Sequence, residues 1–223
     1  MTEAADRCAR LASALQAAAD ADRAVSMAAY MKGIAPFFGV PAPRRRALQR
    51  EVLAGWTPDE LEIIEFASSA WRIDEREMQY AACDVLERGA KRSSAELLVT
   101  LERLITTKSW WDTVDALAAA VGTLVQRFPE LRTTMDRWIE SDNDWLARVA
   151  IIHQLRFKAD TEHERLFAYC VRRAADSEFF IRKAIGWALR EYAKTEPAAV
   201  RAFVDEHEAV LSGLSKREAR KHL

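Results

Sequence analysis

The clearest hydrophobic pattern in the chain lies between residues 110 and 128. Apolar side chains recur there at intervals of three or four residues, as on one face of an α-helix; they are Trp110, Val114, Leu117, Val121 and Leu124. The neighbouring stripe of the same helix carries Trp111, Asp115, Ala118 and Gly122. The spacing therefore predicts one helix with a buried face and, beside it, a shallow groove flanked by one indole ring and one carboxylate.

Similar periodicity divides the whole chain into helices joined by short turns. Pro43 and Pro58 suit a first helical turn, "TPDE" (57–60) supplies an N-cap, and "SSAE" (93–96) can form a capping box. No segment alternates as a strand does, and the one persistent irregular stretch is 33–43. The predicted helices span 3–19, 24–32, 42–54, 58–70, 74–89, 93–106, 110–128, 130–141, 144–157, 161–175, 178–194 and 197–211. The predicted fold class is all-α.

A repeat is visible in the second half of the chain. "WWDTVDALAAAV", "WLARVAIIHQLR" and "FFIRKAIGWALR" align on Trp111, Trp145 and Phe179, which are successively 34 residues apart. Each unit holds an apolar helix followed by a more amphipathic one, as in helical-pair solenoids, whose stacked repeats form a concave surface. We expect a HEAT-like helical-repeat solenoid that forms a single domain over residues 1–223.

Composition narrows the class of protein. Half of the 223 residues are apolar, and there are only 7 Gly and 6 Pro, which suits a helix-rich globular chain. No apolar run approaches about 20 residues, and the first residues lack the hydrophobic segment of a signal peptide. The three cysteines are scattered, and the four histidines show no ligand spacing with them. We expect a cytoplasmic, monomeric protein with no membrane segment, no cofactor and no metal.

Charge is segregated along the chain although the net charge is only −1. Residues 57–75 carry six acids and one base, whereas residues 148–194 carry ten bases and six acids. "PRRRALQR" and the C-terminal "SKREARKHL" add further basic runs. Such asymmetry is expected if one surface meets a polyanion and another keeps the protein soluble.

Two further helices carry candidate chemistry, each with a structural alternative. Arg148 is the only charged residue between positions 145 and 155, so it needs an anion, either a carboxylate such as Asp115 or a phosphate. On the helix 178–194, Trp187 lies among Lys183, Arg190 and Lys194, which favours contact with nucleic acid. The alternatives are that long basic stems merely cover a half-buried ring and that Trp111 and Asp115 are an edge-of-core ring and a solvated charge.

Five long motifs, in order along nearly the whole chain, resemble the DNA alkylation repair family of AlkD-type glycosylases. They are "YMKGIAPFFGVPAPRRR" (30–46), "TKSWWDTVD" (107–115), "SDNDWLARVAIIHQL" (141–155), "EFFIRKAIGWALREYAKTEP" (178–197) and "LSKREARKHL" (214–223). The resemblance implies a HEAT-like solenoid that holds duplex DNA in its concave face and excises alkylated purines without pulling the lesion into a pocket. It places the paired tryptophans at Trp111 and Trp187, the catalytic carboxylate at Asp115 and the lesion-site arginine at Arg148.

A set of basic and aromatic residues is expected to contact the DNA. Those expected on the same side as Trp187 are Lys183, Arg190, Lys194, Lys216 and Arg217, with Arg45, Lys108 and Tyr30 as further candidates. One departure concerns the N-terminal contact, because Pro41 or Ala42 replaces the polar residue that relatives often place before "PxRR".

The chemistry implied by the resemblance explains why tryptophans adjoin an acid. A purine alkylated at N3 or N7 is already cationic, so its departure needs stabilisation of an electron-poor sugar and a positioned water rather than a strong acid. An ionised Asp115 could supply both, Trp111 and Trp187 could face the cation, and Arg148 could hold a phosphate and keep Asp115 ionised. Two alternatives stay open, a protein-binding helical scaffold and a relative that binds DNA structures without catalysis.

Overall fold

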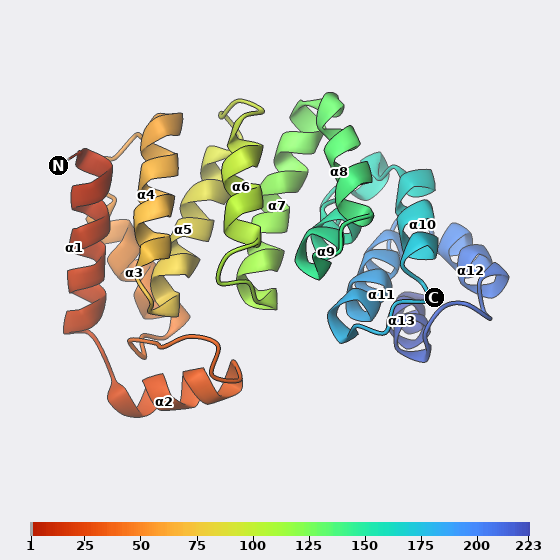
Figure 1. Cartoon of the computed structure of the whole chain (residues 1–223), viewed down its shortest axis with the longest axis horizontal. Coiled ribbons are helices and arrows are strands. Elements are labelled where there is room, and N and C mark those ends of the chain that lie inside the picture. Colours follow the sequence, from red (N-terminus) through yellow and green to blue (C-terminus); the bar gives the residue numbers. More distant parts are fainter. Residues whose placement is uncertain (1) are drawn as a thin grey trace. The chain divides into compact units, whose positions relative to one another are not determined.

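The computed structural model describes residues 2–223, apart from the side chain of His222, and these residues form α-helices and short 3₁₀ helices with no strand (Figure 1). The predicted all-α class is therefore confirmed. The described chain divides into two compact units, one ending at Leu104 and the other running from Ile105 to Leu223. A single domain over residues 1–223 stays a prediction. No helix among the described residues is long and apolar enough to cross a membrane.

The first unit is built around paired helices. Its elements are α1 (Glu3–Ala17), α2 (Ala21–Tyr30), α3 (Ala42–Val52), α4 (Glu60–Arg72), α5 (Arg76–Gly89) and α6 (Leu97–Ile105). Helix α4 packs against both α1 and α5, and α3 contacts α1 and α5. Leu11, Phe66 and Met78 are fully buried between them, whereas α2 buries none of its residues.

The irregular segment before α3 is fixed by a buried acid. Glu77, on α5, accepts hydrogen bonds from the backbone N–H groups of Phe38, Gly39 and Val40 at 2.9–3.1 Å. Pro41 then serves as the N-cap of α3 without a side-chain bond, and Pro43 lies in its first turn, as the sequence predicts. The segment is thus part of the folded first unit, with three of its donors satisfied internally.

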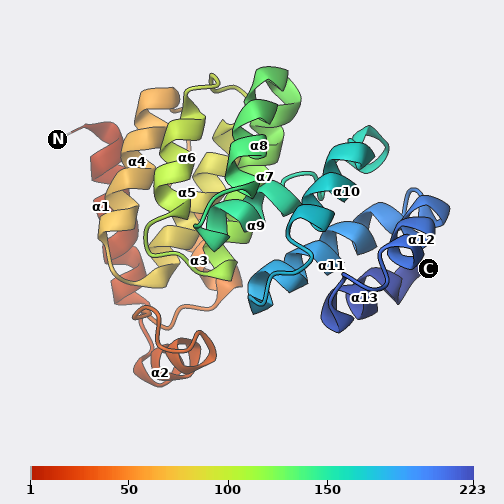
Figure 2. The same cartoon turned by 45° about the vertical axis from the view of Figure 1, so that its right-hand side comes forward.

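The second unit consists of stacked helices in two layers (Figures 1 and 2). Its α-helices are α7 (Trp111–Arg127), α8 (Arg132–Ile139), α9 (Asp144–Ile152), α10 (His163–Arg172), α11 (Phe179–Ala193), α12 (Pro197–Glu206) and α13 (Gly213–Ala219). Helices α7, α9, α11 and α13 pack successively side by side, while α8 and α10 contact α9, and α12 contacts α11. Successive odd-numbered helices thus bring residues about one repeat apart in sequence into contact, which is the predicted repeat arrangement.

The core faces agree closely with the predicted stripes. On α7, Val114, Leu117, Val121 and Leu124 are fully buried. Trp110 differs, because it precedes α7 as its N-cap and is only half-buried. Its backbone is extended there, so its ring is not part of the helical stripe.

Several helix ends differ from their predicted positions. Helix α4 begins at Glu60, where Asp59 and Glu62 form a capping box two residues later than "TPDE" suggested. Helix α6 begins after "SSAE", at Leu97. The backbone N–H and hydroxyl of Ser94 bind Glu60, and the same hydroxyl accepts from the backbone N–H of Glu96. Helix α9 ends at Ile152, and a turn follows.

Helix α13 was not predicted, because "SKREARKHL" was interpreted only as a basic run. Ser212 caps this short helix through its hydroxyl, which accepts from the backbone N–H of Ser215 at 3.0 Å. The helix packs along α11 and buries Ser215 and Glu218. Its stability therefore comes from tertiary packing, which overrides the weak helical signal of a segment in which six of seven residues are charged or small.

Candidate active site

The centre of the candidate site is an ion pair between α7 and α9. Nε and Nη2 of Arg148 donate to Oδ1 and Oδ2 of Asp115, each at 2.7 Å. Nη1 of the same guanidinium donates to the backbone carbonyl of Phe180, in the first turn of α11. Arg148 is thus bonded to both neighbouring helices of its layer, and its planar fork fixes the orientation of the carboxylate.

Burial differs sharply between the two partners. The Arg148 side chain is 1% exposed, whereas the Asp115 side chain is 23% exposed. The expectation that Arg148 holds a DNA phosphate does not fit this geometry, because its guanidinium is enclosed and is bonded to Asp115 and Phe180. The carboxylate of Asp115 is the partner that reaches solvent.

The environment of Asp115 acts on its acidity in two directions. Burial raises the pKa of the carboxyl above its ordinary value, while the hydrogen bonds and charge of Arg148 oppose that rise. Asp112, one turn earlier, adds a smaller upward contribution to the same pKa. The net effect is a raised pKa, so this carboxyl takes up a proton more readily than a solvated aspartate.

Aromatic rings border the ion pair. The guanidinium carbon of Arg148 lies 5.2 Å from the ring centroid of Trp187, and Nζ of Lys183 lies 5.6 Å from the same ring. Trp111, half-buried at the start of α7, precedes Asp115 by one helical turn. The structure thus brings Asp115, Arg148 and Trp187 together, with Trp111 on the same stripe of α7 as the carboxylate.

A second aromatic cluster supports the N-terminal ends of the same helices. The ring of Phe180 lies 5.1 Å from that of Trp110 and 5.2 Å from that of Trp145, centroid to centroid. Trp110 and Trp145 are themselves 5.9 Å apart. One aromatic residue from the start of each of α7, α9 and α11 therefore packs into a single cluster, which fixes the spacing of the helices that carry the site.

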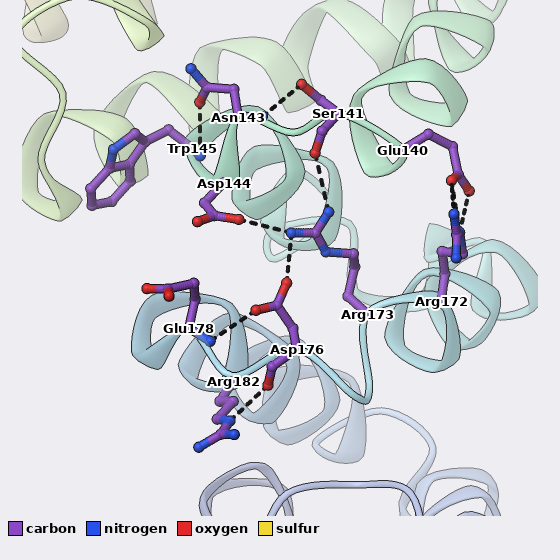
Figure 3. A network of polar contacts seen from close by, with 10 residues as sticks. All are labelled: Glu140, Ser141, Asn143, Asp144, Trp145, Arg172, Arg173, Asp176, Glu178 and Arg182. Atoms are coloured by element: carbon purple, nitrogen blue, oxygen red, sulfur yellow. Dashed lines mark hydrogen bonds and ion pairs between the residues drawn. The ribbon is translucent and has the colours of Figure 1, made fainter.

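A polar network also connects the starts of α9 and α11 (Figure 3). The guanidinium of Arg173 donates to Asp144 and Asp176 at 2.8 and 2.6 Å and to the Ser141 carbonyl at 3.1 Å. Nε of Arg182, on α11, donates to the Asp176 carbonyl at 2.8 Å. The "SDND" motif therefore serves to anchor these helices, with Asn143 as the N-cap of α9.

The groove predicted beside Asp115 is present as a small cavity of about 150 Å³. Its lining includes Asp115, Ala118 and Gly122 of α7 and the segment that follows α9, with His153 and Arg156. Gly122 is required by this packing, because a Cβ there would lie 2.2 Å from the His153 carbonyl oxygen. Burial lowers the pKa of His153 to about 4, so this imidazole is neutral at pH 7.

The predicted DNA contacts of the second unit are mostly paired with acids. Lys183 and Arg190 both bind Glu218, Lys194 binds Glu191, and Lys216 binds Glu208. Arg217 and Lys108 are exposed, and Lys108 adopts a positive φ of 50°. The structure thus brings Lys183 and Arg190 together next to Trp187.

The two candidates of the first unit differ in accessibility. Tyr30 is exposed at the end of α2. Arg45 is buried, and its Nη1 donates to Gln49 and Asp84 at 2.8 and 2.9 Å. Arg45 was therefore wrongly expected at the surface, because "PRRR" opens a helix that turns one of its three arginines inward.

Sequence reasoning missed three features of this site. The carbonyl of Phe180 as a ligand of Arg148 has no side-chain signal at all. Glu218 was counted only as the one acid in a basic run, and Gly186, beside Trp187, was not singled out. A glycine inside an otherwise regular helix was the available signal for Gly186, since a Cβ there would lie 2.5 Å from Cβ of Glu218.

No group of three His, Cys, Asp or Glu side chains that could hold a metal ion occurs among the described residues.

Comparisons with known proteins identify the family of the chain. Residues 11–223 match the family model for DNA alkylation repair enzymes. A solved structure named as a predicted DNA alkylation repair enzyme from Enterococcus faecalis is 34% identical, with a TM-score of 0.84 over 92% of this chain and 96% of that one. The crystal structure of AlkD2 from Streptococcus mutans, 18% identical, has a TM-score of 0.62 over 78% of this chain and 87% of that one, and so shares the fold. The curated proteins give no match. The chain belongs to the DNA alkylation repair enzyme family.

Proposed function

We propose that this protein is a monofunctional DNA glycosylase that hydrolyses the N-glycosidic bond of cationic alkylated purines in duplex DNA. Its substrates are of the N3-methyladenine and N7-methylguanine class, and the reaction is the first step of base excision repair. The observation that carries this proposal is the partly exposed Asp115 carboxylate, which the buried Arg148 orients through two hydrogen bonds.

The reaction needs little from the protein besides a placed negative charge. Water attacks C1′ of the sugar as the bond to the purine nitrogen breaks, and the bonding electron pair leaves with the base. The departing base thereby becomes neutral, and the proton lost by water passes to solvent. Asp115 stabilises the positive charge that develops on the sugar and orients the water.

The surrounding residues support this assignment of roles. Arg148 donates to both carboxylate oxygens and so limits the conformational freedom of Asp115 before substrate arrives. Trp111 and Trp187 are half-buried, and their rings can face a cationic base or sugar. No lysine is required as a nucleophile, so the product is an abasic site in an unbroken strand.

The direct test is to incubate the protein with alkylated duplex DNA and identify the released purine by mass spectrometry. We expect free alkylpurine and abasic sites, in excess of the spontaneous release measured without protein. A protein that binds the duplex and releases no base would instead be a non-catalytic DNA-binding member of the fold. A protein that does not bind the duplex would leave only a role as a protein-binding scaffold.

A further inference from the structure

The buried carboxylate of Glu218, on α13, binds three basic side chains. Oε1 of Glu218 accepts from Nζ of Lys183 at 2.9 Å, and Oε2 accepts from Nη1 of Arg190 at 2.7 Å and from Nζ of Lys221 at 2.9 Å. The four groups together carry a net charge of +2. The bonds from Lys183 and Lys221 lower the pKa of Glu218 to about 2, so the acid is ionised across the physiological range.

The acid lies behind the bases that it holds. The Glu218 side chain is 7% exposed, whereas those of Lys183 and Arg190 are 23% and 28% exposed. Each base gives Glu218 one hydrogen bond, although an ammonium has three donors and a guanidinium five. Donors therefore remain on two cations that one carboxylate draws close together.

The backbone around Glu218 is built for close contact with α11. Gly186 lies opposite α13, where a Cβ would be 2.5 Å from Cβ of Glu218 and 3.0 Å from the Ser215 carbonyl oxygen. The Ser215 hydroxyl donates to the Arg182 carbonyl at 2.9 Å. These contacts fix the carboxylate relative to α11, so the positions of Lys183 and Arg190 are set by the packing of two helices.

The paired cations adjoin the candidate active site. Lys183 lies against the ring of Trp187, and the same ring is in contact with Arg148, the partner of Asp115. A ligand that contacts Trp187 therefore lies close to Lys183. In a DNA substrate, the group adjacent to base and sugar is a phosphodiester.

We propose that Glu218 is a positioning residue that holds Lys183 and Arg190 as a preorganised two-cation site for one backbone phosphate of DNA beside Trp187. This inference rests on the proposed function, because it identifies the partner of these cations as the DNA substrate. Holding both side chains before binding removes part of the ordering cost that long basic side chains otherwise impose on association.

Replacing Glu218 by glutamine separates this role from simple charge masking. If Glu218 only neutralised the cations, E218Q would add positive charge and strengthen binding to any duplex. If it positions them, E218Q weakens binding by roughly 2- to 12-fold for each side chain released. The measurement is the Kd for an undamaged duplex by fluorescence anisotropy, over a series of salt concentrations.

Glu140→Gln is the matched control, because Glu140 also binds an arginine, Arg172, and is exposed outside the site as the C-cap of α8. It makes the same change of net charge, and we expect binding to be unchanged or slightly stronger. Lys183→Gln and Arg190→Gln should each weaken binding and reduce the salt slope by about one unit. The loss of affinity caused by each substitution should be smaller in the E218Q background, where the two cations are no longer held together.

Two results would overturn the proposal: tighter binding by folded E218Q, or unchanged affinity and salt slope in both Lys183→Gln and Arg190→Gln. The second result can be measured even if E218Q fails to fold, because the side chains of Lys183 and Arg190 are partly exposed and their variants should remain folded. Base release by wild-type protein is measured in parallel. If the wild-type protein releases base but Lys183→Gln and Arg190→Gln bind DNA with unaltered Kd, only the phosphate site is rejected. If the wild-type protein releases no base, the proposed glycosylase activity is rejected.

Discussion

Arg148 and Asp115 face each other across α9 and α7 with two parallel hydrogen bonds of 2.7 Å. The arginine is enclosed, and the carboxylate is the member of the pair that remains partly exposed. The buried guanidinium of Arg148 therefore fixes the orientation of the partly exposed Asp115 carboxylate. In the proposed mechanism, Asp115 provides the chemistry and Arg148 fixes its geometry.

The first prediction concerns pH. In the proposed mechanism Asp115 acts as an anion. Because burial raises its pKa, base release should fall on acidification at a higher pH than an ordinary aspartate of pKa about 3.9 would give. The folded state also binds this proton more tightly than the unfolded state, so the stability linked to Asp115 is lost as pH rises through the raised pKa. A pH–rate profile of single-turnover base release checks this, and an acid limb at the ordinary aspartate value would contradict it.

The second prediction concerns Arg148→Met, which keeps apolar volume and removes the guanidinium. Loss of one partner of a buried pair should destabilise the protein by about 3–5 kcal/mol. Because Arg148 opposes the rise in the pKa of Asp115, the acid limb should also move to higher pH. Urea unfolding measures the first effect, and pH–rate profiles at a temperature where circular dichroism shows the variant folded measure the second. An unmoved acid limb would show that Arg148 does not act through Asp115.

The third prediction concerns the contact between α11 and α13. Gly186→Ala places a methyl group 2.5 Å from Cβ of Glu218, so the helices must separate, at a cost of about 1–3 kcal/mol. Gly213→Ala is the matched control, since the nearest atom to a Cβ there is Arg217 Nη1 at 3.5 Å. We expect a lower melting temperature for Gly186→Ala and no loss for Gly213→Ala. Equal melting temperatures would mean that this close approach is unimportant.

The fourth prediction concerns the segment that precedes α3. Glu77→Ala removes the acceptor of three backbone N–H groups, and each buried donor left unpaired costs about 1–3 kcal/mol. We expect a loss of unfolding free energy of several times that of an average surface substitution. Glu75→Ala, the same change at the residue that precedes α5, is the comparison in urea unfolding. Similar stability of the two variants would contradict the role given to Glu77.

The helical pattern could be predicted from local spacing, and the need of Arg148 for an anion could be predicted from its isolation on an apolar helix. The core stripe of α7 and the anion needed by Arg148 were both confirmed. What the sequence did not reveal depends on contacts between helices. Helix α13, the inward turn of Arg45 and the carbonyl of Phe180 are determined by packing partners far away in the chain.

The charged residues show the same limit in a different way. Their clustering predicted a surface for a polyanion, but periodicity does not reveal which base is paired with which acid. Glu218 is the clearest case, since a single acid in a basic run lies at the centre of three cations. The pairing became visible only once α13 was placed against α11.

Asp115→Asn gives the most direct test of the central claim, that the Asp115 carboxylate stabilises the developing sugar cation. Single-turnover release of alkylated purine from duplex DNA should slow by roughly 10²–10³, the cost of losing one preorganised electrostatic partner. The Kd for the duplex should be unchanged or lower, because a negative charge facing the phosphates is lost. Circular dichroism at the assay temperature verifies that the variant is folded, since Arg148 loses part of its partner. Release of the base at the wild-type rate by folded Asp115→Asn would show that the carboxylate is only structural and would contradict the mechanism.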